Sequence, residues 1–211
     1  MTKSKGWNWK IASDDINSTW KVPSIESYYL LNRWSSLGFK NFLDLGCGIG
    51  RHTVLFAGNG FNTCGFDISK YGLDKTKEWL DSLNLSANLK EGDMLDLPYE
   101  NDSFDLVFSS LAIHYFSKEK TAQLINEIHR VLKDGGLFIG SVNGLEGYNS
   151  IKDTAIKLEE NFYFNKGKYI HLFNDKELRK YFKDYQILKI EKREVERFGH
   201  KKNYWIFIVK K

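Results

Sequence analysis

Cysteine, proline and long apolar runs are all scarce in this sequence of 211 residues. Its two cysteines, Cys47 and Cys64, form no CxxC pair and no other spacing typical of metal ligands, so the sequence predicts no metal site. We interpret both as reduced, packed thiols. A nucleophilic Cys47 is the alternative, but this residue falls between two glycines of a tight loop.

Segments that could target or anchor the chain are also missing. The N-terminal sequence MTKSKGWNWK has no apolar run of the length that a secretory signal requires, and the longest apolar run, residues 204–209, is too short to cross a bilayer. Hydrophobic residues make up 42% and charged residues 27% of the chain, which indicates a globular rather than a disordered protein. We therefore expect a single domain over residues 1–211, located in the cytoplasm and without a membrane span.

The net charge of +4 conceals a segregation of charge along the chain. Residues 1–149 carry a net charge of −3, whereas residues 150–211 carry +7. A basic segment of this kind is either a solvated, lysine-rich surface or a field that attracts an anionic substrate, nucleic acid or a membrane surface. The charge count alone leaves both interpretations open.

Short apolar runs alternate with helical patterns through the first two thirds of the sequence. Because strand and helix alternate, the pattern predicts a parallel sheet. Ser117 is a candidate N-cap for the last of the helices, and Gly135 and Gly136 are expected to end it. The expected strands cover residues 41–45, 62–67, 87–91, 104–109 and 136–142, and the expected helices cover residues 51–59, 70–83 and 118–132.

The last part of the chain has a different pattern. A helix over residues 175–182 precedes two alternating segments, residues 186–191 and 203–209, which we expect to form an antiparallel hairpin. The predicted fold class is therefore α/β. It consists of a doubly wound, mostly parallel seven-stranded sheet that is completed by the C-terminal hairpin.

Two segments lie outside this pattern. Residues 1–37 precede the first strand, and residues 143–174 follow the fifth. Ligands of α/β folds bind at the carboxyl ends of the strands, where such additions gather. We therefore expect both segments to form lids over a core of residues 40–142, with residues 175–211 supplying the last helix and the hairpin. The N-terminal segment is rich in tryptophan, at Trp7, Trp9, Trp20 and Trp34.

The most informative motif is DLGCGIG, which begins at Asp44, directly after the first expected strand. Gly46, Gly48 and Gly50 have no Cβ atom, so the backbone there can turn sharply and approach a ligand closely. Such a loop can bind NAD, but the dinucleotide pattern requires glycine where Arg51 stands. The acidic Asp44 suits a ligand with an ammonium and a sulfonium better than one with a pyrophosphate.

Three further motifs follow at suitable spacing: GFDIS, GDMLDLPYENDSFDLVFS and HRVLKDGG. With the glycine loop, they make residues 40–142 resemble the class I, Rossmann-like S-adenosylmethionine-dependent methyltransferases. The likeness is greatest to the broad small-molecule group that includes quinone-biosynthesis and tellurite-resistance enzymes. One departure is Asp134, which replaces the proline of the usual LKP and affects a turn rather than the chemistry.

The resemblance implies how S-adenosylmethionine is bound. Asp44 and the backbone around Gly46, Cys47 and Gly48 would hold its methionine portion. Asp67, at the end of the second strand, would accept hydrogen bonds from both ribose hydroxyls. Capping the next helix is the alternative role for Asp67.

The resemblance also implies contacts to the adenine and to the methyl group. Ile68 would pack on the adenine, Asp93 would accept a hydrogen bond from its exocyclic amine, and the Met94 N–H would reach a ring nitrogen. Ser109 and Leu111 would lie beside the transferable methyl group. For Asp93, a role in the turn after a glycine is the alternative.

Catalysis of methyl transfer makes few demands on the protein, because the sulfonium is already activated and displacement mainly needs an in-line nucleophile at short range. If the acceptor requires a base, His114 and His171 are the candidates by location. Structural support of the surrounding loop is the alternative for each. Arg51 either pairs with the carboxylate of the cofactor or is a surface residue at the start of a helix.

The acceptor is less well determined. The sequence SSLAIHYF after the fourth strand lacks the (D/N/S)PP(Y/F/W) pattern of enzymes that methylate exocyclic amines of bases, and the chain has no Pro-Cys pair. Nucleic acid is therefore an unfavoured partner, although the basic residues 150–211 keep RNA or anionic lipid as an alternative. Aromatic residues of the second lid either wall a pocket for an aromatic or amphipathic acceptor or form the lid's own core. They are Tyr148, Phe162, Tyr163, Phe164, Tyr169 and Phe173.

The sequence thus predicts methyl transfer from S-adenosylmethionine to a small molecule by direct in-line displacement. Two alternatives share the same motifs. One is a methyltransferase that acts on RNA or another macromolecule, and the other is a catalytically silent S-adenosylmethionine-binding module that regulates a partner. Neither the acceptor nor the oligomeric state can be read from the residues.

Overall fold

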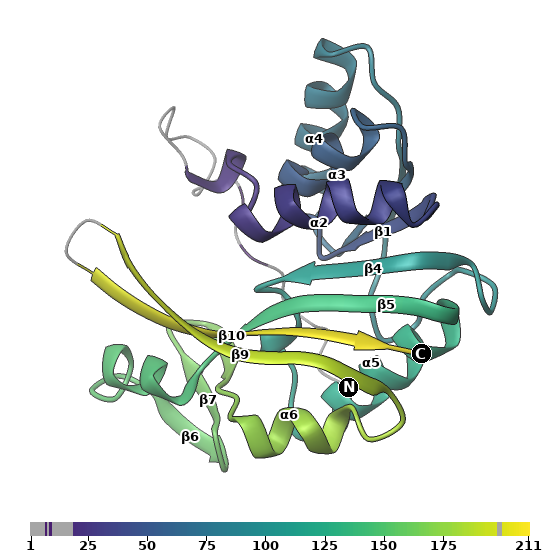
Figure 1. Ribbon diagram of the computed structural model, residues 1–211. Coiled ribbons are helices and arrows are strands. Elements are labelled where there is room, and N and C mark those ends of the chain that lie inside the picture. The colour runs from purple at the N-terminus through teal and green to yellow at the C-terminus, as the bar shows by residue number, and fades with distance from the viewer. Residues whose placement is uncertain (1–6, 8, 10–18, 198–199) are drawn as a thin grey trace.

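The computed structural model describes residues 7, 9, 19–197 and 200–211. Its main feature is a seven-stranded sheet with the strand order β3-β2-β1-β4-β5-β10-β9 (Figure 1). The first five strands along the chain pair in parallel, and β10 pairs antiparallel with both β5 and β9. The predicted fold class is confirmed. The strands are β1 (Asn41–Leu45), β2 (Asn62–Asp67), β3 (Asn88–Glu91), β4 (Phe104–Ser110), β5 (Leu132–Asn143), β9 (Gln186–Arg197) and β10 (His200–Lys210).

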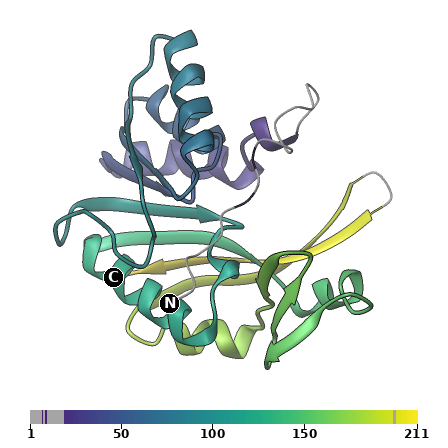
Figure 2. The same cartoon turned by 180° about the vertical axis from the view of Figure 1, so that it is seen from behind.

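Helices cover both faces of the sheet (Figures 1 and 2). One face is covered by α2 (Ile25–Ser36), α3 (Arg51–Ala57) and α4 (Lys70–Ser82), and the other by α5 (Lys118–Val131) and α6 (Asp175–Tyr181).

Side-chain alternation along the strands builds a separate core on each face. On β1, Phe42 packs in the cluster on the α2 and α3 side, while its neighbour Leu43 packs in the cluster on the α5 and α6 side. Both side chains are fully buried. The central strands are therefore apolar on both faces, which is why the sequence shows them as short continuous apolar runs rather than as alternating ones.

The junction between α5 and β5 differs from its prediction. Gly135 and Gly136 do not end the helix, because α5 stops at Val131 and β5 begins at once with Leu132. Gly135 has a φ of +79°. The pairing of β5 with β4 also shifts register at this point. The glycines therefore allow an irregularity inside a strand, where one residue must adopt a left-handed conformation.

Part of the N-terminal segment belongs to the core rather than to a lid. Helix α2 buries Leu30, Leu31 and Trp34 against the sheet, and Trp34 is only 1% exposed. The ring of Trp34 stacks on that of Phe56 from α3 at a centroid distance of 5.7 Å. The three other tryptophans of this segment lie outside α2. One of them, Trp20, belongs to the short 3-10 helix η1 (Thr19–Lys21).

The segment after β5 forms a small structure of its own. It contains the 3-10 helix η3 (Leu145–Ser150) and a separate antiparallel sheet with the order β6-β7-β8. Strand β8 lies against η2 (Ile113–Tyr115), the 3-10 turn that follows β4. The segment therefore reaches the carboxyl end of the main sheet. Its strands are β6 (Ile156–Glu159), β7 (Phe162–Asn165) and β8 (Lys168–His171).

Within the described ranges, no helix combines the length and the apolar character that crossing a membrane requires.

Candidate functional site

A cavity of about 390 Å³ opens at the carboxyl ends of the parallel strands. The loops that follow β1, β2, β3 and β4 line one part of it, and residues of the β7–β8 turn and the N-terminal tryptophans line the rest. The strand order reverses at this position, because the chain builds β2 and β3 on one side of β1 and then places β4 on the other. Such a switch point is where open α/β sheets bind their ligands.

The glycine loop has the conformation that its sequence predicts. Gly46, Gly48 and Gly50 all have positive φ angles, of +76°, +57° and +84°. A Cβ atom on Gly46 would lie 2.4 Å from the Cβ of Ala112, and one on Gly50 would lie 2.4 Å from Thr76. Only glycine fits these positions. Gly46 borders the cavity, whereas Gly48 and Gly50 lie outside its lining.

Asp67 links the glycine loop to the second strand. One of its carboxylate oxygens accepts a hydrogen bond from the Gly48 N–H and the other from the Ser69 N–H, each at 2.8 Å. Burial raises the pKa of this carboxyl group, and the two backbone hydrogen bonds oppose that shift. The helix-capping alternative is taken by Ser69, whose Oγ accepts from the Gly72 N–H. Asp67 borders the cavity.

Two predicted site residues lie behind the cavity wall. Asp44 is 1% exposed, and one of its oxygens accepts hydrogen bonds from the backbone N–H and the hydroxyl of Thr53, at 2.9 and 2.7 Å. Burial raises the pKa of Asp44 to about 7. Ser109 is fully buried and donates its hydroxyl to the Leu45 carbonyl at 2.8 Å. Neither side chain lines the cavity. Both instead form hydrogen bonds that hold the neighbouring segments in place.

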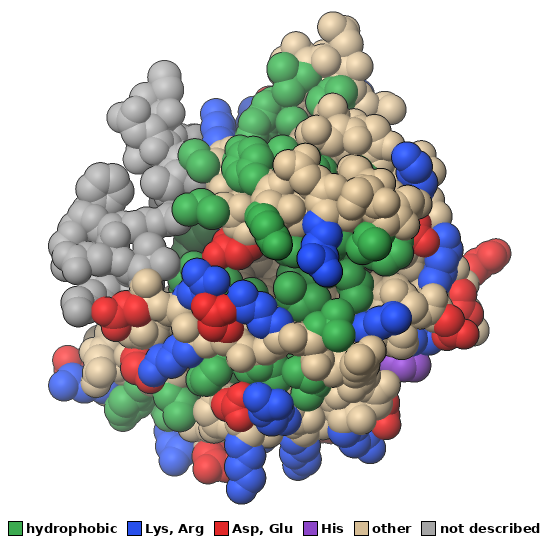
Figure 3. All heavy atoms as spheres, in the orientation of Figure 1, with side chains coloured by type: hydrophobic (Ala, Val, Ile, Leu, Met, Phe, Trp, Pro, Cys, Tyr) green, Lys and Arg blue, Asp and Glu red, His purple; other side chains and the backbone are tan. Residues whose placement is uncertain are grey.

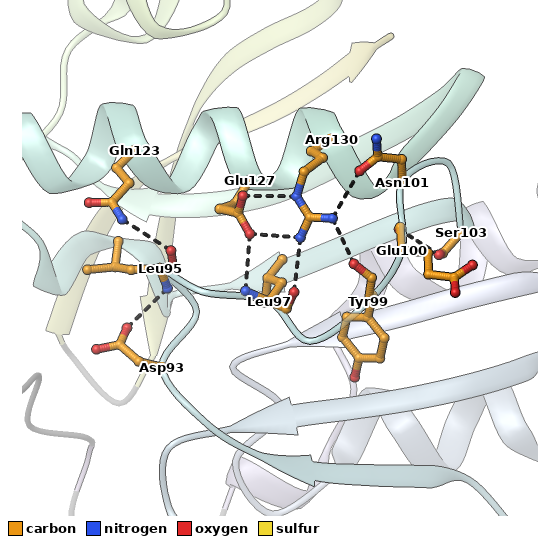
Figure 4. Close-up of polar contacts among 10 residues, drawn as sticks. All are labelled: Asp93, Leu95, Leu97, Tyr99, Glu100, Asn101, Ser103, Gln123, Glu127 and Arg130. Carbon is orange, nitrogen blue, oxygen red and sulfur yellow. Dashed lines mark hydrogen bonds and ion pairs between the residues drawn. The ribbon is translucent and has the colours of Figure 1, made fainter.

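The loop after β3 is held in place by side chains of helix α5 (Figure 4). Asp93 accepts a hydrogen bond from the Leu95 N–H at 3.1 Å, which fits its turn role, and it also borders the cavity together with Met94. Farther along, Glu127 accepts from the Leu97 N–H, and Arg130 donates to the Leu97 carbonyl at 2.9 Å. The Arg130 guanidinium also binds Glu127 and the Tyr99 carbonyl. Sequence reasoning missed this network, because its residues are far apart along the chain.

The two histidine candidates have different positions. His114 is 5% exposed and borders the cavity, and its Nδ1 has no hydrogen-bond partner among the described residues. Burial lowers the pKa of His114 to about 3, so the ring is neutral near pH 7. His171 is fully buried outside the cavity lining, with Nε2 2.9 Å from Glu177 and its ring stacked on Phe173. Of the two candidates, the structure therefore brings only His114 to the cavity.

Three other predicted site residues, Cys47, Ile68 and Leu111, also border the cavity. Burial raises the pKa of the Cys47 thiol well above its ordinary value, which argues against a thiolate nucleophile. Leu111 has a φ of +54°, an uncommon value for a residue other than glycine, and its N–H donates to the Ser141 carbonyl at 2.9 Å. The chain thus leaves β4 through a constrained turn at the cavity.

Tryptophans, rather than the aromatic residues of the second lid, form the far wall of the cavity. Trp7, Trp9 and Trp20 all border it and pack on one another, with ring centroids 5.6 to 6.5 Å apart. A Cβ atom on Gly48 would lie 2.1 Å from the Trp9 ring, so this indole rests on the glycine loop. The lid aromatics instead stack mainly among themselves, as Phe162 does on Tyr169 at 5.6 Å. Those that were candidates for the wall but do not line the cavity are Tyr148, Phe162, Tyr163, Phe164, Tyr169 and Phe173.

Arg51 and Lys168 bring positive charge to the same wall. Arg51 donates to the Val22 carbonyl and to the Ser110 hydroxyl, both at 3.3 Å, and lies 5.8 Å from the Trp20 ring centre. The Lys168 ammonium lies 3.5 Å from the centre of the Trp7 ring. Sequence reasoning placed Arg51 near a ligand as one of two alternatives and did not select Lys168.

Comparison with known proteins agrees with this geometry. Residues 42–136 match the family model of methyltransferase domains. An uncharacterized methyltransferase of Synechocystis is 38% identical over 97 residues, which cover 46% of this chain and 43% of that protein. The demethylmenaquinone methyltransferase of Lactobacillus johnsonii is 33% identical over 118 residues, which cover 50% of this chain and 48% of that protein. The chain thus spans less than half the length of either relative.

A solved structure extends the likeness beyond the matched segment. An S-adenosylmethionine-dependent methyltransferase from Methanosarcina mazei has a TM-score of 0.73 to this chain at 22% sequence identity. The match covers 82% of this chain and 92% of that one. At this identity the likeness shows the fold, which is the Rossmann-like architecture expected from the motifs.

Proposed function

We propose that the protein, whose residues 42–136 match the family model of methyltransferase domains, transfers a methyl group from S-adenosylmethionine to a small-molecule acceptor by direct in-line displacement. The observation that carries the proposal is a single cavity with two unlike sides. The loops after β1, β2 and β3 border one side, and three indoles with three cationic side chains border the other. The cofactor would bind to the first side and the acceptor to the second.

The residues on the first side fit the cofactor. An ionised carboxylate has about four sites for hydrogen-bond donors. Asp67 uses two of them for backbone N–H groups, which leaves capacity for the two ribose hydroxyls. Asp93 and Met94 would bind the adenine edge, and Ile68 would pack on its face. When bound, S-adenosylmethionine supplies an activated methyl group on a sulfonium.

Asp44 has a different part in this proposal from the one that the motif implies. Its carboxylate ties β1 to the start of α3 through Thr53, on the two sides of the glycine loop. We assign it the role of a positioning residue that keeps the loop open beside the methionine portion of the cofactor.

His114 serves the acceptor better as a hydrogen-bonding group than as a base. A group with a pKa of about 3 takes up protons poorly near pH 7, because general bases work best with a pKa near the operating pH. Its ring nitrogen Nδ1 is buried and unpartnered among the described residues, and a turn of the ring toward the cavity would bring it to a polar atom of the acceptor. Orientation of the nucleophile is therefore the contribution that we propose for this residue.

Calorimetric titration with S-adenosylhomocysteine and with NAD tests the cofactor. We expect binding of S-adenosylhomocysteine and none of NAD at the same concentration, because the loop after β1 lacks the third glycine of the dinucleotide pattern. Tight NAD binding without a response to S-adenosylhomocysteine would overturn the proposal.

Release of S-adenosylhomocysteine in the presence of candidate acceptors tests turnover. The acceptors should span phenols, thiols, amines, carboxylates and metalloid oxyanions. Turnover with any of them excludes the catalytically silent module. Cofactor binding without turnover across the whole set would instead favour the regulatory or the macromolecular alternative.

A further inference from the structure

The two sides of the cavity differ in the sign of their charge. Of the described lining residues, the two carboxylates are Asp67, which ends β2, and Asp93, which lies in the loop after β3. Among the described lining residues of the other side there is no carboxylate, but there are three cations, Arg51, Lys166 and Lys168. The proposed acceptor side is therefore positively charged as well as aromatic.

Two of these cations are delivered by one tight turn. Asn165 and Lys168 are the last cross-strand pair of the β7–β8 hairpin, and Lys166 and Gly167 between them have φ angles of +47° and +82°. Positive φ angles at both central residues define the turn whose twist matches the flanking strands. Three of its four residues, namely Asn165, Lys166 and Lys168, border the cavity. The turn thus holds both lysines at the mouth of the proposed acceptor site.

Among the described residues, Lys168 has no carboxylate partner. Its half-buried ammonium rests on the face of the Trp7 ring, and it has no ion pair within the part of the chain that the structure describes. Burial also lowers the pKa of Lys168. On the outer surface of the same lid, by contrast, Lys118 of helix α5 pairs with Glu160 at 3.1 Å. A partly desolvated cation beside an aromatic wall is well suited to a ligand that brings its own negative charge.

From these observations, and resting on the proposed function, we infer that the acceptor is a planar aromatic molecule with an anionic substituent, whose ring lies among the N-terminal indoles and whose anion binds Lys168 and Lys166. The indoles supply flat apolar surfaces. The two ammonium groups supply charge-assisted hydrogen bonds that a neutral analogue cannot replace. Lys168 is accordingly a specificity-determining residue, and removing it should affect anionic acceptors alone.

A matched pair of probes tests the inference by equilibrium binding to the protein saturated with S-adenosylhomocysteine. The probes are 6-hydroxy-2-naphthoate and its neutral amide, which have the same ring and hydroxyl but differ in charge. We expect the anion to bind about tenfold more tightly than the amide, the order of effect of one hydrogen bond to a charged group. Substitution Lys168→Met should remove most of this difference, with Lys166 still present, and leave the affinity for the amide nearly unchanged.

The control variant is Lys157→Met. Lys157 is an exposed lysine on β6 of the same small sheet and does not line the cavity, so its loss removes the same charge from the same lid. It should leave the preference for the anion intact. Equal affinity for the two probes, no binding of either, or an equal loss of both in Lys168→Met would each overturn the inference.

The same titrations separate this inference from the proposed function. If S-adenosylhomocysteine binds to wild-type protein and to both variants while the charge preference is absent, the inference fails and the proposed function stands. If S-adenosylhomocysteine does not bind to the wild-type protein at all, the proposed function itself fails.

Discussion

The loops after β1, β2 and β3 differ in construction from the segments that close the other side of the cavity. The loops are held by short, buried polar contacts to strand residues, such as the Gly48 N–H to Asp67 hydrogen bond, and by the contacts of Asp44 with Thr53 at the start of α3. The opposite side is assembled from the N-terminal indoles and the β7–β8 hairpin turn, which are far apart along the chain. Local motifs therefore specify the first region, and long-range packing specifies the second.

The two regions therefore differ in the substitutions that they can accept. A Cβ atom on Gly46, Gly48 or Gly50 would lie within 3 Å of another side chain, so few substitutions fit in the glycine loop. By comparison, a Cβ atom on Gly167 of the hairpin turn would meet nothing within 4 Å, although its positive φ still favours glycine. The acceptor side can therefore change its chemistry while the cofactor side remains the same, as expected when function depends on loops carried by a common fold.

The largest effect is expected for the substitution Asp67→Ala. It removes the proposed acceptor of the ribose hydroxyls and should weaken S-adenosylhomocysteine binding by about 2 to 3 kcal/mol, the order for lost charge-assisted hydrogen bonds. Calorimetry provides the measurement. The matched control is Asp74→Ala, which removes an exposed carboxylate from α4 and should leave binding unchanged. Unchanged affinity in a normally folded Asp67→Ala variant would place the ribose elsewhere.

His114 lies at the cavity, and its substitution His114→Asn should change how stability depends on pH. Its pKa is about 3 in the folded protein and near 6.5 in the unfolded chain, so the unfolded state binds more protons between these values. Stability from this residue is therefore present above pH 6.5 and is lost as the pH falls toward 3. Between pH 7 and pH 5, wild type should lose about 2 kcal/mol more than the variant.

Urea unfolding at several pH values gives this difference directly. At pH 8 the His114 ring is neutral in both states, so the gap between wild type and variant there reports packing alone. Other buried groups, such as His52 and Asp44, are present in both proteins and cancel in the comparison. Parallel curves for the two proteins from pH 8 to pH 5 would contradict the neutral, buried ring.

Substitution Trp20→Ala should separate the two sides of the cavity. Trp20 packs on both other indoles of the wall, at 5.6 and 5.8 Å. Its removal should weaken binding of 6-hydroxy-2-naphthoate by about tenfold, equivalent to about 1.4 kcal/mol, and leave S-adenosylhomocysteine binding nearly unchanged. The control is Trp79→Ala on α4, a tryptophan that does not line the cavity. Equal losses for both ligands would mean that the indoles support the fold and not the acceptor.

The smallest effect is expected when binding to RNA is measured. The basic end of the chain carries charges of both signs, because Lys189 pairs with Glu191 and Lys192 with Glu146, and Figure 3 shows acidic and basic side chains interspersed over the lower half of this face. A continuous track for phosphates is therefore not formed by these residues. Binding to generic RNA should be weak and depend only shallowly on salt. Submicromolar affinity with a logarithmic salt slope steeper than about −3 would support the RNA alternative.

Several predictions from sequence match the structure because they rest on local rules. The apolar runs and the helical pattern of residues 118–132 predict strands and helix α5 to within a few residues, and Ser117 caps that helix as expected. The lid aromatics and Gly135 were harder to interpret. A cluster of aromatic residues looks the same whether it faces a ligand or its own neighbours, and a glycine pair can end a helix or interrupt a strand.

By itself, the sequence determined the alternating α/β order, the glycine loop and the acidic ends of the second and third strands, because helix and strand periodicity and positive-φ turns are properties of short segments. Only the tertiary structure decided which residues meet at the cavity. In it, Asp44, Ser109 and His171 lie outside the lining of the cavity, and three indoles line the cavity together with Lys168. The physical reason is that such contacts depend on how distant segments pack, and no local pattern records the burial or the direction of a side chain.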